Sequence, residues 1–307
     1  CGNRSDLRRE AVNGRNLAQC VTQTPIPRRG IGVQCYTDSM NVAVGFFIFI
    51  FGLIVGSFLN VVVARRGTGL SLGGRSFCFS CGEILSARDL IPLVSFVLSR
   101  GRCRRCGSAI SPVYPLVELG TALLFVFVFM RLHPATAQDI FLFMLWSLIG
   151  ALFLSIVVYD IRHKIIPDGF VWTANGIAFL FLILRAAAHG LSSWDVLAGP
   201  LLAAPFAALW FFSRGRWMGL GDAKLALGIG WLLGLSGGFA AVLLSVWTGA
   251  LFGILALMLR TLSFGGKKFT IRSEIPFAPF LVLGTFLVFF YGIDFYDIES
   301  WFTFFAS

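Results

Sequence analysis

The stretch NVAVGFFIFIFGLIVGSFLNVVV, residues 41–63, contains no charged side chain. A helix rises about 1.5 Å per residue, so roughly 20 apolar residues cross the hydrocarbon core of a bilayer. The whole chain agrees with this feature, since 57% of its residues are hydrophobic and 13% are charged, against about 25% charged in soluble domains. The sequence therefore predicts an all-α polytopic membrane protein that is embedded in the lipid bilayer.

Further apolar runs follow the first one and are separated by short polar segments. Each is long enough to be read as a membrane-spanning helix, except that the sixth is short and rich in glycine. Together they predict about eight transmembrane helices. The predicted spans are 41–63, 114–131, 138–159, 169–186, 195–212, 222–236, 238–259 and 278–293.

Lysine and arginine are distributed unevenly between the two sets of loops. After the first span, 16 of them fall on one side of the predicted membrane, and only Arg131 and Arg185 fall on the other. Basic loops stay in the cytoplasm, so the long loop after the first span is predicted to be cytoplasmic. The net charge of +10 then reflects topology, and no nucleic-acid partner is predicted.

Residues 1–39 do not fit this orientation, because their six arginines would lie on the outer side. The segment has no apolar signal-peptide core and does not begin with methionine. We interpret 1–39 as a non-native extension, with Met40 as the natural start, or alternatively as a disordered extension. Its cysteines Cys1, Cys20 and Cys35 are given no functional role.

Four further cysteines lie in the long basic loop as two C-x2-C pairs separated by 21 residues: Cys78, Cys81, Cys103 and Cys106. Two such pairs can present four thiolates to a tetrahedral Zn²⁺. The alternatives are two disulfides, which a reducing cytoplasm disfavours, or four free thiols. The spacing predicts a structural zinc site that folds the loop, because four protein ligands leave no open position for catalysis.

Two aspartates occur where apolar runs meet the cytoplasmic side. Asp160 ends the third span, and Asp222 begins the sixth in the sequence Gly219-Leu220-Gly221-Asp222. A carboxylate beside hydrocarbon is costly unless it is paired or protonated, which favours a catalytic pair that shares a proton. In the alternative interpretation, Asp222 only caps a helix. A transporter or a non-enzymatic scaffold of a secretion apparatus are the competing functions.

Several segments together resemble the type IV prepilin leader peptidases, a family of Gly-x-Gly-Asp membrane aspartyl proteases. The resemblance extends over most of 44–284. Besides the cysteine loop and the two aspartates, it is carried by Gly56-Ser57-Phe58-Leu59-Asn60-Val61-Val62, Tyr114-Pro115-Leu116-Val117-Glu118-Leu119, Ile166-Pro167-Asp168, Gly219-Leu220-Gly221-Asp222-Ala223-Lys224 and Pro276-Phe277-Ala278-Pro279.

The resemblance implies a prepilin peptidase in the bacterial inner membrane that removes the short basic leader of prepilins or pseudopilins. It also implies S-adenosylmethionine-dependent N-methylation of the new N-terminus, although the sequence identifies no residues that bind this cofactor. Asp160 and Asp222 take the catalytic positions. The residues expected to line the active site are Gly219, Gly221, Pro276, Phe277 and Pro279.

The predicted domain organisation is an extension 1–39, a first transmembrane helix 40–64, a cytoplasmic zinc-binding and methyltransferase loop 65–113, and a protease domain 114–307. The sequence departs from many relatives at Arg162, Leu90 and Phe79, where Asp or Glu, Asn and Pro are usual. Glu118 is interpreted as part of the methyltransferase site or as a structural residue. Asp168 is expected to cap the fourth span.

Overall fold

The computed structural model describes residues 31–66, 68, 71, 73–190, 192–259, 263–264, 267–268 and 275–298. Most of the predicted N-terminal extension, residues 1–30, lies outside the described residues. The chain divides into two units, residues 1–44 and 45–307. The fold and the site described below belong to the second unit, except for the N-terminal part of α1, which belongs to the first.

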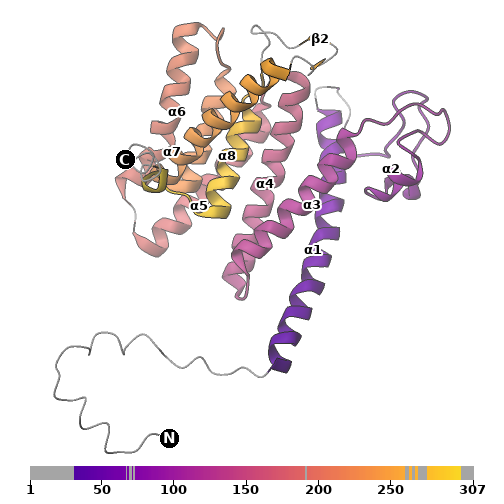
Figure 1. Ribbon diagram of the computed structural model, residues 1–307, viewed down its shortest axis with the longest axis horizontal. Helices are drawn as coiled ribbons and strands as arrows, with labels where there is room; N and C mark the ends of the chain where they lie inside the picture. Colours follow the sequence, from indigo (N-terminus) through magenta and orange to yellow (C-terminus); the bar gives the residue numbers. More distant parts are fainter. Residues whose placement is uncertain are drawn as a thin grey trace, which may run out of the picture. The chain divides into compact units, whose positions relative to one another are not determined.

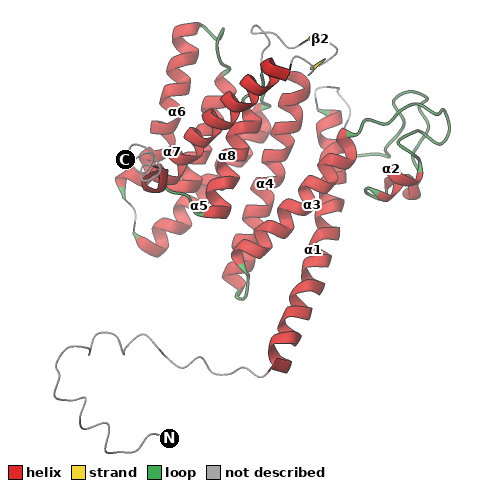
Figure 2. Ribbon diagram, in the orientation of Figure 1, coloured by secondary structure: helices red, strands yellow, loops and turns green. Residues whose placement is uncertain are grey.

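Helices account for nearly all of the regular structure (Figures 1 and 2). The long helices are α1 Ile31–Arg65, α3 Val113–Leu132, α4 Ala137–His163, α5 Asp168–His189, α6 Ser193–Ser213, α7 Leu220–Leu259 and α8 Ala278–Tyr291. Between α1 and α3 lie the short helices η2 Ala87–Leu90 and α2 Val94–Leu98. Within the described ranges, the only strands are an antiparallel pair of two residues each, β1 Ser263–Phe264 and β2 Lys267–Lys268. The all-α prediction is confirmed.

Six of the described helices are long and apolar enough to cross a membrane, and α8 is shorter, with 14 residues. Large apolar side chains point outward from these helices; Phe47 is 71% exposed and Phe212 is 79% exposed. Such surfaces are stable in lipid but not in water. The protein is therefore a multi-pass membrane protein.

Helix α7 has 40 residues and is interrupted at Gly234, where the backbone adopts φ 78° and ψ −177°. Its second half folds back on the first, since a Cβ atom placed on Gly238 would lie 3.4 Å from the Cα atom of Gly230. In a straight helix, residues eight apart are separated by about 12 Å. The two halves correspond to the predicted sixth and seventh spans.

Helix α4 runs through the centre of the bundle in Figure 1 and packs against α3, α5 and α8. Its side chains Ile149, Phe153 and Ile156 are completely or almost completely buried. In the first half of α4, the ring of Trp146 stacks on Phe289 of α8, with 3.7 Å between the ring centroids. These contacts hold α4, whose last turn carries Asp160, inside the bundle.

We expect the substitution Gly234→Ala to destabilise the protein, because a Cβ atom is strained at positive φ by about 1–3 kcal/mol. Thermal unfolding in detergent should show a melting temperature several degrees lower. Gly176→Ala on α5 is the control, since nothing lies within 4 Å of the added methyl group. An unchanged melting temperature for Gly234→Ala would contradict the fold-back at this residue.

Candidate active site

Asp160 lies in the last turn of α4 and is 5% exposed. The helix ends three residues later, at His163, because Lys164 adopts a left-handed conformation. Residues 165–167 then run without regular structure, and Pro167 is extended (φ −70°, ψ 122°). The predicted extended or turn segment before Pro167 is thus present, since the residue before a proline avoids the helical region.

Asp222 is the third residue of α7 and is 8% exposed. The helix begins at Leu220, so Asp222 does not occupy the N-cap position that the alternative interpretation required. The negative charge of Asp160 acts on Asp222, so the two carboxyl groups lie within electrostatic range of each other although they are 62 residues apart in the sequence. The structure therefore brings both predicted aspartates to the same end of the bundle.

Close packing holds the two aspartate-bearing segments against each other. A Cβ atom on Gly221 would lie only 2.7 Å from the Cβ atom of Ile166, so that no larger residue fits there without movement. Nearby, the ammonium group of Lys224 pairs with the Asp168 carboxylate. The expected cap at Asp168 is wrong, because Pro167 occupies the N-cap position of α5 and the Asp168 carboxylate pairs with Lys224 on α7.

The segment Pro276-Phe277-Ala278-Pro279 forms the start of α8, with Phe277 at the N-cap and Pro279 in the first turn. The backbone N–H of Ala278 donates a hydrogen bond to the Asp160 carboxylate. The ring of Phe277 lies 6.1 Å from that of Phe206 on α6, measured between centroids. The segment predicted to line the site is thus in contact with Asp160, at the positive end of a helix dipole.

Gly219 precedes α7, and the nearest atom to a Cβ placed there is the Gly221 nitrogen, at 3.9 Å. The space beside the Gly-Leu-Gly-Asp backbone is therefore open on the Gly219 side and filled by Ile166 on the Gly221 side. Two buried carboxyl groups with a helix N-terminus beside one of them can divide the roles of acid and base, because one stays protonated when the other ionises.

The four loop cysteines gather into one cluster, in which all Sγ atoms lie within 4.8 Å of one another. Each pair sits in the same kind of turn. The Gly82 N–H donates to the Cys78 carbonyl at 2.8 Å, and the Gly107 N–H donates to the Cys103 carbonyl at 2.9 Å. Both glycines have positive φ, 75° and 71°, which explains why glycine follows the second cysteine of each pair.

The cluster fits a zinc ion. Four sulfurs 2.3 Å from a tetrahedral zinc are about 3.8 Å apart, and the Cys78 and Cys106 sulfurs are 3.9 Å apart. The backbone N–H groups of Cys81 and Ser80 donate to the Cys78 sulfur and, with the Ser108 hydroxyl, lower the pKa of this thiol to about 6. A thiolate is the form that binds metal, so the turn prepares Cys78 as a ligand at neutral pH.

The residue Glu118 connects the cysteine loop to the membrane helices. It lies on α3, is 9% exposed and accepts a hydrogen bond from the Leu93 N–H at 2.8 Å and another from Ser57 on α1. On the next turn of α1, the Asn60 side chain donates to the Tyr114 carbonyl at 3.0 Å. Asn60 and Tyr114 were assigned no role beyond their place in the resembling motifs, and the burial of the Asn60 side chain in this polar contact indicates a structural role.

Comparison with known proteins identifies relatives of this chain. Residues 50–132 match the family model described as the bacterial peptidase A24 N-terminal domain, and residues 146–254 match the type IV leader peptidase family. The chain is 35% identical over 261 residues to the prepilin leader peptidase/N-methyltransferase of Bacillus subtilis, which covers 81% of this chain and 96% of that protein. The chain belongs to the type IV leader peptidase family.

Further members of this family give similar values. The protein of the same name from Pseudomonas aeruginosa is 31% identical over 292 residues, covering 84% of this chain and 93% of that protein. The one from Aeromonas salmonicida is 31% identical over 275 residues, covering 80% and 90%. No solved structure matches this chain significantly. One matched region contains the cysteine loop, and the other contains Asp160 and Asp222.

The purified leader peptidase should contain about one zinc ion per chain, measured by elemental analysis of protein kept reduced. Replacing Cys78 or Cys103 with serine should lower this content to near zero, because the three remaining thiolates hold zinc more weakly. Cys35→Ser, which precedes the first apolar run in the sequence, is the control. Reduced wild-type protein without zinc would contradict the site.

Proposed function

We propose that this leader peptidase is a membrane aspartyl endopeptidase of the bacterial inner membrane that removes the short basic leader of type IV prepilins or pseudopilins. It then N-methylates the new N-terminus, with S-adenosylmethionine as methyl donor. The names of the curated relatives support both activities. The same relationship favours a peptidase over the transporter and scaffold alternatives.

The observation that carries the peptidase proposal is the proximity of two buried carboxyl groups, Asp160 in the last turn of α4 and Asp222 in the first turn of α7, beside the start of α8. Asp160 and Asp222 are the proposed catalytic residues. In the proposed mechanism, one ionised carboxylate takes a proton from the attacking water. The other, protonated, donates to the carbonyl oxygen of the scissile peptide bond.

The described neighbours of the pair supply the remaining parts of the proposed site. The Ala278 N–H orients the Asp160 carboxylate. The glycine-containing turn at Gly219 leaves room for an extended substrate backbone, which a protease requires. We assign Gly219, Gly221, Pro276, Phe277 and Pro279 to the walls of this active site.

The proposed orientation places the aspartates, the cysteine loop and the basic loops on the cytoplasmic side. Its support is the excess of Lys and Arg in those loops. In this arrangement 65–113 forms the zinc-binding methyltransferase part, and 114–307 the protease part. The zinc is assigned a structural role, because four cysteine ligands complete its coordination.

The substitutions Asp160→Asn and Asp222→Asn should each lower the rate of leader removal by at least about 100-fold, because an amide can neither accept nor donate the required proton. The measurement is cleavage of a candidate prepilin by purified protein in detergent or liposomes. Asp139→Asn, at the opposite end of α4, serves as the matched control and should retain cleavage. Cleavage at the wild-type rate by either active-site variant would refute the pair.

The substrate should be cut near the cytoplasmic interface, between the last glycine of the leader and the first residue of the mature helix. Glycine weakens a helix by roughly 1 kcal/mol relative to alanine, which favours the extended form. Replacing this glycine with a bulky residue should block cleavage, whereas changes deep in the pilin helix should not. Mass spectrometry of the product tests this: a cut within the apolar segment would contradict the topology.

A further inference from the structure

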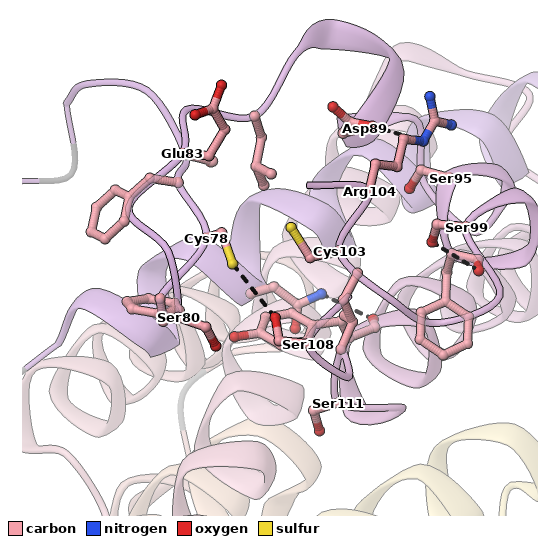
Figure 3. Close-up of a pocket in the computed structure, with 18 of the residues that line it drawn as sticks. Cys78, Ser80, Glu83, Asp89, Ser95, Ser99, Cys103, Arg104, Ser108 and Ser111 are labelled. Atoms are coloured by element: carbon pink, nitrogen blue, oxygen red, sulfur yellow. Dashed lines mark hydrogen bonds and ion pairs between the residues drawn. The ribbon is translucent and has the colours of Figure 1, made fainter. Parts of the chain in front are cut away.

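A cavity of about 770 Å³ lies between the cysteine loop and the membrane helices α1 and α3. This volume falls in the range of about 300–1,000 Å³ that is typical of small-molecule sites. One wall is the loop with its short helices η2 and α2, whose lining residues are labelled in Figure 3. The other wall is formed by residues of α1 and α3. The cavity is separate from the aspartate pair, which does not line it.

The helix side of the cavity carries a buried carboxyl group. Glu118 is 9% exposed, and its hydrogen-bond donors are neutral, the Leu93 N–H and the Ser57 hydroxyl. Among the described residues, no Lys, Arg or His forms an ion pair with it. A carboxylate that is removed from water without a cationic partner is costly. A positively charged ligand in the cavity would therefore stabilise the ionised form of Glu118.

The loop side offers flat rings and hydroxyl groups. Phe77, Phe96 and Tyr114 line the cavity. Figure 3 shows Ser95 and Ser99 from the α2 region among the lining residues. Aromatic rings attract cations and stack on planar heterocycles. The lining also contains four arginines, two of which pair with Asp89 and Glu83, so a cation is favoured only beside Glu118. A fitting ligand therefore combines a cation placed beside Glu118 with an aromatic ring system and hydroxyl groups.

The cavity also adjoins the segment that carries Asp160. The guanidinium group of Arg162, two residues after Asp160, lies 5.4 Å from the ring centroid of Tyr114. At the end of α1, Arg66 lies over the Phe170 ring at 4.5 Å. The contact between Arg162 and Tyr114 therefore connects the segment of Asp160 to one wall of the cavity.

We propose that this cavity binds S-adenosylmethionine and that Glu118 provides its counter-charge, so the methyl-donor site is shared between the loop and the membrane helices. This inference rests on the proposed methyltransferase function. The donor is a sulfonium cation that carries an adenosine group, and it supplies the methyl group when bound. The new N–C bond forms as the S–C bond breaks with its electrons going to sulfur, and the resulting ammonium loses one proton.

The test is equilibrium dialysis of radiolabelled S-adenosylmethionine with the full-length protein in detergent. Glu118→Gln removes the charge but keeps an oxygen that can accept from Leu93, and should raise the dissociation constant about tenfold or more. Ser95→Trp fills the cavity and should abolish binding. In the controls, Asp195→Asn and Val97→Trp, the dissociation constant should stay within about twofold of wild type. Asp195 is a carboxylate paired with Arg185, Val97 lies on α2, and neither residue lines the cavity.

Zinc content and leader cleavage are measured on every preparation, as checks on the folding of the loop and of the membrane helices. If both cavity variants bind S-adenosylmethionine with wild-type affinity, the proposed location of the binding site is wrong, while the proposed methyltransferase function still stands. Loss of zinc together with loss of binding in both variants would also count against it, because a structural role would then explain the result. If the wild-type protein neither binds the donor nor yields a product heavier by one methyl group, the proposed methyltransferase function itself fails.

Discussion

The burial of two carboxyl groups at one end of the bundle constrains the arrangement of the surrounding helices. Asp160 and Asp222 repel each other when both are charged, and burial strengthens this repulsion. The N-terminus of α8 offsets part of this cost, since the Ala278 N–H donates to Asp160 and the dipole of the helix favours negative charge there. The end of α4 and the starts of α7 and α8, which are far apart in the sequence, must therefore lie at one place.

Close packing at a glycine and one ion pair hold these helix ends together. Gly221 packs directly on Ile166, and the Asp168–Lys224 ion pair connects the start of α5 to the first turn of α7. The ion pair is partly exposed, and such pairs contribute little to stability, about 0–1 kcal/mol. Its geometric effect is more relevant here, because small displacements of catalytic groups lower rates strongly.

The cysteine loop depends on the membrane helices as well as on its own cluster. Its two turns are built alike around Cys78 and Cys103, and a metal bound to them would fix the turns relative to each other. The Leu93–Glu118 hydrogen bond then attaches the loop to α3. If zinc and Glu118 act together in this way, the loop and the helices enclose one cavity beside the peptidase site, and both proposed reactions can occur on a substrate that stays in the membrane.

The sequence by itself determined the membrane class, the approximate spans, the cysteine cluster and the two aspartates at span ends. These features are local: apolar runs of sufficient length, a fixed spacing of thiols and acids beside hydrocarbon can all be recognised without knowing how the helices pack. The break in α7 was also visible as a glycine-rich sixth span, because only glycine adopts the backbone conformation found at Gly234.

Only the tertiary structure decided which groups meet. The Ala278–Asp160 bond, the Lys224–Asp168 pair and the Glu118 contacts with Leu93 and Ser57 join residues that are 25 to 118 positions apart. Asp168 illustrates the difference: its position beside a helix start favoured a cap, yet a lysine from another helix competed for the same carboxylate. Partners of this kind depend on helix rotation and depth, which are set by packing across the whole bundle and leave no local pattern in the sequence.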